Sequence, residues 1–80
     1  MTREEIEAKV ISLVAKTLNK DEADVQLKSS FKDDLEADSL GIAELGMAFE
    51  DEFEISMDED NLESINIVED AVNIIQDLVG

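Results

Sequence analysis

Apolar residues recur at helical spacing in three stretches of this chain, and this spacing is the feature that most constrains its fold. In residues 3–18 they form one stripe along a single helical face, made of Ile6, Val10, Leu13, Val14 and Leu18. Thr2 with Glu5 three residues later matches a capping box, and Asn19 is a typical helix end. The sequence therefore predicts a first helix over residues 3–18.

The second periodic stretch begins at Ser39 or just before it and ends near Glu52 and Phe53. Its apolar residues form a broad band made of Leu40, Ala43, Leu45, Met47, Ala48 and Phe49. Gly41 and Gly46 lie inside this predicted helix, where each glycine costs ~1 kcal/mol relative to alanine. Close packing would explain the two glycines, and so would an exposed, mobile helix start.

Two further helices are predicted in the last third of the chain. Ser56 with Glu59, or Asp58 alone, can cap a short third helix that runs through Ser64 and turns Leu62 inward.

The last helix is expected to open with a capping box formed by Asn66 and Glu69. Its apolar residues are Val68, Ala71, Val72, Ile75, Leu78 and Val79. Residues 19–38 show no sustained period and are expected to form a long loop, which in a compact domain is usually functional. The predicted fold is all-α: one domain over residues 1–80, a four-helix bundle of three longer helices and a short third one, with a long loop between the first two.

Several classes of protein are excluded by composition. The chain has no cysteine and no histidine, which removes disulfides, the usual zinc ligand sets and Ser-His catalysis. No apolar run is long enough to span a membrane, and residues 1–20 lack the apolar stretch of a signal peptide. A soluble, intracellular protein is expected, and Met1 favours a complete bacterial-type chain.

The charges are unevenly distributed. All six basic residues lie in residues 1–32, whereas residues 33–80 contain sixteen acids and no base, which accounts for the net charge of −16. So one-sided a field disfavours nucleic acid and anionic membranes as ligands. It favours partners with basic surfaces, although an acidic surface can also serve solubility alone.

One serine stands between the acidic loop and the second predicted helix. Ser39 could be an ordinary helix cap, but the positive end of a helix is also a favourable place for an attached phosphate. The segment around it resembles the phosphopantetheine attachment motif of acyl carrier proteins at Phe31, Asp34, Leu35, Ala37, Asp38, Ser39 and Leu40. Residues 44–53 resemble the second helix of that family and residues 65–72 the start of its last helix, so the resemblance covers essentially the whole chain.

The resemblance implies a carrier and not an enzyme. A phosphopantetheinyl transferase would attach 4'-phosphopantetheine to Ser39, which Asp38 and Leu40 flank, and the terminal thiol would carry acyl groups as thioesters. It also implies a cytoplasmic monomer that serves fatty-acid or polyketide synthesis enzymes through their basic docking patches.

The resemblance further implies two sets of site residues. The partner-binding set comprises Ala43, Glu44, Met47, Glu50, Asp51, Glu59 and Glu63. The acyl chain would lie between helices against Phe31, Leu35, Leu45, Phe49, Met57, Leu62, Ile65 and Ala71, which could equally be simply the core.

Three positions depart from the family pattern. Gly41 stands where an acid is common, Glu36 where a glycine is common, and Ile74 where a tyrosine is frequent. Gly41 could mark a specialised carrier, or it could be sequence drift without a role. A specialised carrier for polyketide, lipid A or aminoacyl groups is an alternative to a fatty-acid carrier.

Two alternatives to a carrier stay open from the residues alone. One is an acidic docking module that is never modified. The other is a divalent-cation module, because Asp58, Asp60 and Glu69 take the first, third and twelfth positions of an EF-hand loop. Leu62 and Glu63, however, occupy positions that need an oxygen ligand and a glycine, so weak, non-specific binding is expected in place of a dedicated metal site.

Overall fold

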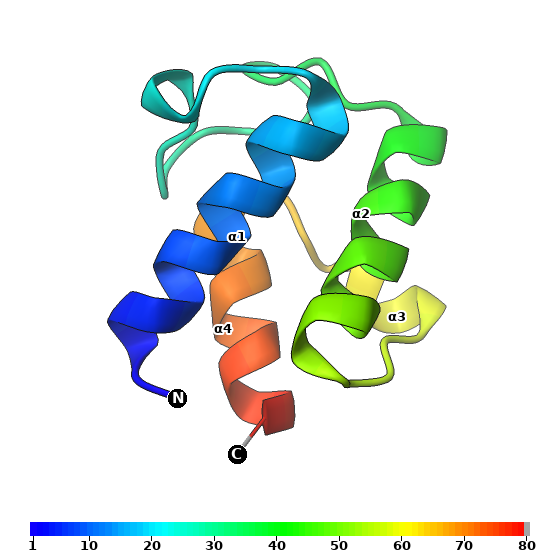
Figure 1. Cartoon of the computed structure of the whole chain (residues 1–80). Coiled ribbons are helices and arrows are strands. Elements are labelled where there is room, and N and C mark those ends of the chain that lie inside the picture. Colours follow the sequence, from blue (N-terminus) through cyan, green and yellow to red (C-terminus); the bar gives the residue numbers. More distant parts are fainter. Residues whose placement is uncertain (80) are drawn as a thin grey trace.

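The computed structural model describes residues 1–79 and is helical apart from its connections. Its elements are α1 (Arg3–Leu18), the short 3-10 turn η1 (Glu22–Asp24), α2 (Ser39–Phe53), α3 (Glu59–Glu63) and α4 (Val68–Val79). In Figure 1, α1, α2 and α4 form the body of the bundle, the short α3 lies beside α2, and the long loop closes the end opposite the N-terminus. The predicted all-α arrangement with a short third helix is confirmed.

Local signals at both ends set the length of α1. The Thr2 hydroxyl accepts a hydrogen bond from the Glu5 backbone N–H at 3.2 Å, and the Glu5 carboxylate accepts from the Thr2 N–H, so the predicted capping box is present. Asn19 ends the helix in the left-handed conformation at φ 58°, which asparagine adopts more readily than most residues. The predicted bounds of this helix are confirmed.

The start of α3 is capped by an aspartate. The Asp58 carboxylate accepts from the Asn61 backbone N–H at 2.9 Å, and the Asn61 side chain accepts from the Asp58 N–H at 3.1 Å. Of the two caps predicted here, Asp58 is therefore the one that forms, and Ser56 stays outside the helix.

The capping box predicted at the start of α4 is wrong. The carboxylate of Asp70 accepts hydrogen bonds from the backbone N–H groups of Asn66 at 3.0 Å and Ile67 at 3.1 Å. Glu69, which the prediction placed in this role, turns instead toward Lys28 of the long loop. Because α4 begins at Val68, Asp70 and not Glu69 is the third helical residue, and its carboxylate satisfies the free backbone donors.

The long loop is tied to the start of α4 by backbone hydrogen bonds. The N–H of Phe31 donates to the carbonyl of Asn66, that of Val68 to Ser29, and that of Glu69 to Leu27, at 2.9–3.1 Å. We call this pairing of residues 27–31 with 66–69 the loop–α4 ladder. It seats Phe31 in the core at 1% exposure, so the loop has a fixed course beside α2.

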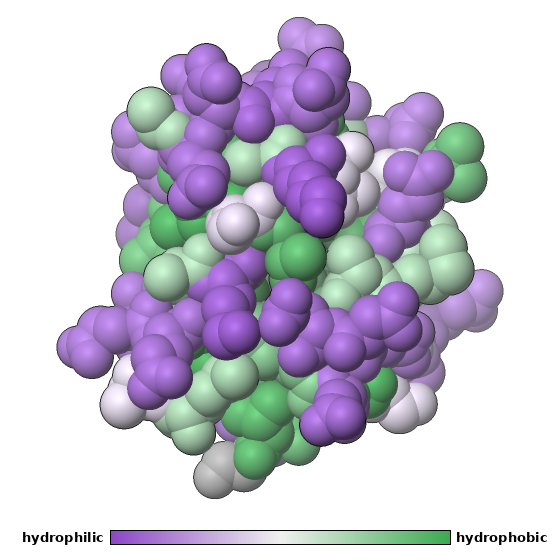
Figure 2. All heavy atoms as spheres, viewed as in Figure 1, coloured by the Kyte–Doolittle hydropathy of each residue, from purple (hydrophilic) through white to green (hydrophobic). Residues whose placement is uncertain are grey.

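The core lies between α1, α2 and α4. Its most deeply buried large side chains are Ile6, Val10, Val14, Phe31, Leu45, Phe49, Val68, Val72 and Ile75. Within residues 1–79 no polar or charged side chain is buried, and Figure 2 shows hydrophilic residues spread over one face with hydrophobic residues between them. None of the described helices is both long and apolar enough to cross a membrane.

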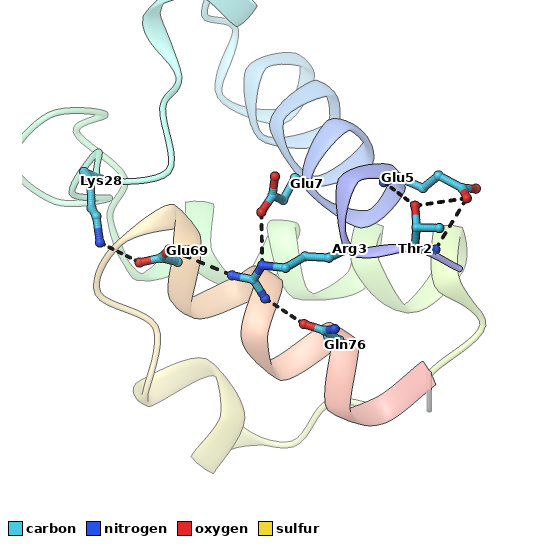
Figure 3. A network of polar contacts seen from close by, with 7 residues as sticks. All are labelled: Thr2, Arg3, Glu5, Glu7, Lys28, Glu69 and Gln76. Carbon is cyan, nitrogen blue, oxygen red and sulfur yellow. Dashed lines mark hydrogen bonds and ion pairs between the residues drawn. The ribbon is translucent and has the colours of Figure 1, made fainter.

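A network of charges joins the start of α1 to the loop and to α4 (Figure 3). The Arg3 guanidinium contacts Glu7 at 3.1 Å, Glu69 at 3.8 Å and the Gln76 amide oxygen at 2.6 Å. The Lys28 ammonium binds the other oxygen of Glu69 at 2.7 Å. Arg3 and Lys28 are thus engaged with acids of α1 and α4.

The two glycines of α2 differ in their surroundings. A Cβ placed on Gly46 would lie 2.8 Å from Cδ2 of Leu62, closer than atoms in contact allow, so close packing against α3 explains this glycine. A Cβ on Gly41 would lie 3.4 Å from Leu18 and from Asp38, which is ordinary contact. The packing therefore accounts for Gly46 and not for Gly41.

Candidate functional site

Ser39 is the first residue of α2, and its neighbour Asp38 caps the helix. Asp38 is extended (φ −93°, ψ −173°) and its carboxylate accepts from the Gly41 backbone N–H at 2.8 Å. The Ser39 side chain is exposed and makes no hydrogen bond to any residue from 1 to 79. The interpretation of Ser39 as the helix cap is therefore wrong, because Asp38 takes that role and leaves the Ser39 hydroxyl free.

The electrostatic surroundings of Ser39 come from two sources. The N-terminus of a helix carries a partial positive charge, and the first turn of α2 contains no acidic residue. Asp38 supplies a negative charge directly before the helix, with one oxygen held by the Gly41 N–H. An anionic group on Ser39 would thus be stabilised by the helix and opposed by one neighbouring carboxylate.

A groove of about 760 Å³ opens beside Ser39, between the long loop, α2 and α3. Its lining residues are Ser30, Phe31, Lys32, Asp33, Asp38, Ser39, Ile42, Ala43, Glu59, Leu62, Glu63, Ile65 and Asn66. The apolar members come from all three walls, whereas the charged members are exposed. A chain attached to Ser39 could therefore lay an apolar portion into the groove while its polar portion stays in water.

The predicted acyl-chain residues divide into two groups. Phe31, Leu62 and Ile65 line the groove. The other five are part of the closed core and do not line the groove: Leu35, Leu45, Phe49, Met57 and Ala71. The sequence pattern indicated which side of α2 is apolar, but it could not show which of these apolar residues line the groove and which belong to the closed core.

Ile42 lines the groove and was missing from the predicted set. It lies three residues after Ser39 on α2, so the two residues share one face of the helix. This spacing was the available signal, and it places an apolar side chain one turn below the Ser39 hydroxyl.

Most of the predicted partner-binding residues are exposed on α2 and α3: Ala43, Glu44, Met47, Asp51, Glu59 and Glu63. Leu40 and Met47 are unusually open for large apolar side chains, at 67% and 59% exposure. Glu50 differs, because it is partly buried and its carboxylate accepts from the Met57 backbone N–H at 2.9 Å. Glu50 therefore holds the connection between α2 and α3.

The EF-hand alternative does not match the local structure. Residues 59–63 form the helix α3 where a calcium loop would be needed, and the carboxylate of Asp58 caps that helix. Glu69 is paired with Lys28 and Arg3.

Comparison with known proteins identifies the family. The family model for the phosphopantetheine attachment site matches residues 8–75. An acyl carrier protein of Petrotoga mobilis is 46% identical over 77 residues, which is 96% of this chain and 91% of the relative. An acyl carrier protein of Exiguobacterium sibiricum is 43% identical over 76 residues, 95% of this chain and 96% of the relative. The chain therefore belongs to the acyl carrier protein family and carries acyl groups on a phosphopantetheine prosthetic group.

Proposed function

We propose that Ser39 is the attachment residue and that residues 1–80 form a single carrier domain for fatty-acid or related synthesis. The observation that carries this proposal is the free, exposed Ser39 hydroxyl at the N-terminus of α2, beside the groove. Its oxygen would form the phosphodiester bond to the prosthetic group. Once bound, this group supplies the thiol for thioester formation, which the cysteine-free chain lacks.

The residues around Ser39 fit such a group. The start of α2 stabilises negative charge, and Asp38 occupies the Gly41 N–H so that the Ser39 oxygen is not drawn back into capping. Leu40, on the other side of Ser39, is 67% exposed and offers an apolar contact to a modifying enzyme. Ile42 and Phe31 begin the apolar lining into which a carried acyl chain would extend.

The proposed partners are a phosphopantetheinyl transferase and synthase enzymes with basic docking patches. The exposed acids Glu44, Asp51, Glu59 and Glu63 lie on the two helices that flank the groove, and residues 33–80 contain no base. Charges of one sign around a site attract partners of the opposite sign and speed their encounter. We further propose that the carrier is a monomer and that it acts in the cytoplasm.

The test is the intact mass of the protein after incubation with coenzyme A, magnesium and a broad-specificity phosphopantetheinyl transferase. Wild type should gain the mass of one phosphopantetheine, and Ser39→Ala should gain none. Ser12→Ala is the matched control, because Ser12 is an exposed serine on α1 outside the groove, and it should be modified like wild type. A folded wild-type protein that gains no phosphopantetheine mass would favour the unmodified docking module. A Ser39→Ala variant that does gain this mass would show that the attachment residue is not Ser39.

A further inference from the structure

Leu62 lies in a notch that Gly46 leaves in the surface of α2. A Cβ on residue 46 would come within 2.8 Å of Cδ2, 3.3 Å of Cδ1 and 3.5 Å of Cγ of Leu62, so the whole branched end of the leucine uses this space. Gly46 itself is buried and does not line the groove, whereas Leu62 does. Leu62 therefore forms a boundary between the groove and the interior behind it.

The interior behind Leu62 is apolar and closed. Phe49 follows Gly46 by three residues on the same face of α2, and its side chain is fully buried. Met57, in the connection that leads to α3, is 9% exposed. Leu62 packs against the core cluster that contains Phe49 and Met57, so a chain that passed Leu62 would enter this cluster. A chain that stopped short of Leu62 would contact only groove residues such as Phe31 and Ile42.

The element that carries Leu62 is lightly held. The helix α3 has five residues, and Leu62 is only partly buried. Short, partly exposed helices belong to the parts of a fold that open most readily. Moving Leu62 out of the notch therefore requires a shift of this short helix alone, with loss of the contacts that Leu62 makes with the core.

We propose that the contact between Leu62 and Gly46 sets the depth of the acyl groove. Short acyl chains lie in the groove outside Leu62, and longer chains enter the interior by displacing the leucine from the notch. This inference rests on the carrier function proposed for Ser39 and adds a chain-length limit that two named residues determine.

The proposal makes opposite predictions for the two residues. Leu62→Ala empties the notch, so that shorter chains should reach the interior. Gly46→Ala fills the notch and pushes Leu62 toward the groove, so that longer chains should be needed or entry should be lost. In the double variant the new methyl at position 46 occupies part of the space that Leu62 vacates, which should bring the limit back toward wild type.

The test compares saturated chains from butanoyl to dodecanoyl, loaded on wild type, Leu62→Ala, Gly46→Ala and the double variant. The readout is the melting temperature of each loaded protein relative to its own unloaded holo form. Stabilisation should begin at a shorter chain in Leu62→Ala and at a longer chain in Gly46→Ala. Leu13→Ala is the control, since Leu13 is a partly buried leucine of α1 outside the groove, and it should leave the onset unchanged.

Two results would overturn the proposal. One is the same onset length in all four proteins. The other is measured on the unloaded proteins. There, Gly46→Ala should change the melting temperature more favourably, by several degrees, in the Leu62→Ala background than in wild type, because the steric conflict with Leu62 is gone. An equal effect in both backgrounds would show that the two residues are not coupled. Failure of Ser39 modification is seen separately, as absence of the loaded mass, and leaves this second measurement available.

Discussion

Glu36 adopts a left-handed backbone conformation three residues before Ser39, with φ 55°. Its neighbours fix this conformation, because the N–H of Leu35 donates to the Ser30 carbonyl at 3.0 Å and that of Ala37 to the Phe31 carbonyl at 2.6 Å. The left-handed region costs a residue with a Cβ roughly 1–2 kcal/mol, and glycine avoids this cost. The structure thus gives a physical reason why glycine suits this position.

We therefore expect Glu36→Gly to stabilise the domain. The relief of strain is partly offset, by roughly 0.5–1 kcal/mol, because glycine gains freedom in the unfolded chain. The net gain in the free energy of unfolding should be about 0.5–1 kcal/mol, which for a domain of this size raises the melting temperature by roughly 2–8 °C. Thermal and urea unfolding of the unmodified protein, followed by circular dichroism, measures both quantities.

Glu36→Ala is the control that separates strain from charge. It removes the same carboxylate from a chain of net charge −16 but keeps the Cβ atom. The glycine variant should exceed the alanine variant by about 0.5–1 kcal/mol at low and at moderate salt, since steric strain does not depend on screening. An alanine variant as stable as the glycine variant would show that any gain comes from charge alone, and the argument from φ would be refuted.

Three further predictions concern the acidic residues. Added salt or magnesium should raise the melting temperature, because residues 33–80 carry sixteen acids and no base and their mutual repulsion is screened; a flat profile from low to moderate salt would contradict this. Glu44→Lys should weaken docking to a basic synthase surface, measured by calorimetry, without changing the melting temperature, and unchanged affinity would remove Glu44 from the interface. Glu50→Lys should also destabilise the domain, by about 1 kcal/mol, because the Met57 N–H loses its acceptor, whereas Glu50→Gln keeps an acceptor oxygen and should be milder.

The helix ends that the sequence predicted correctly are those decided by near neighbours. Thr2 and Glu5 lie one turn apart, and Asn19 needs only its own backbone preference to stop α1. The motif around Ser39 likewise placed an exposed serine at the start of α2, although Asp38 and not Ser39 became the cap.

The features that the sequence did not predict depend on residues far apart in the chain. The helix α4 begins only at Val68, whose N–H donates to Ser29 of the long loop, so Asp70 takes the capping role that was expected of Glu69. The role of Gly46 became clear only from Leu62 in another helix. Helical periodicity tells which residues face inward, but it does not tell where the groove ends and the closed core begins.

The loop–α4 ladder has a consequence for the order in which the domain assembles. It joins Phe31 to Asn66 and Leu27 to Glu69, so it can form only after the intervening helices have brought distant parts of the chain together. During synthesis, α1, the loop and α2 leave the ribosome before α4 does. We therefore expect the nascent chain to display Ser39 early, while the wall of the groove that Phe31 provides is completed last.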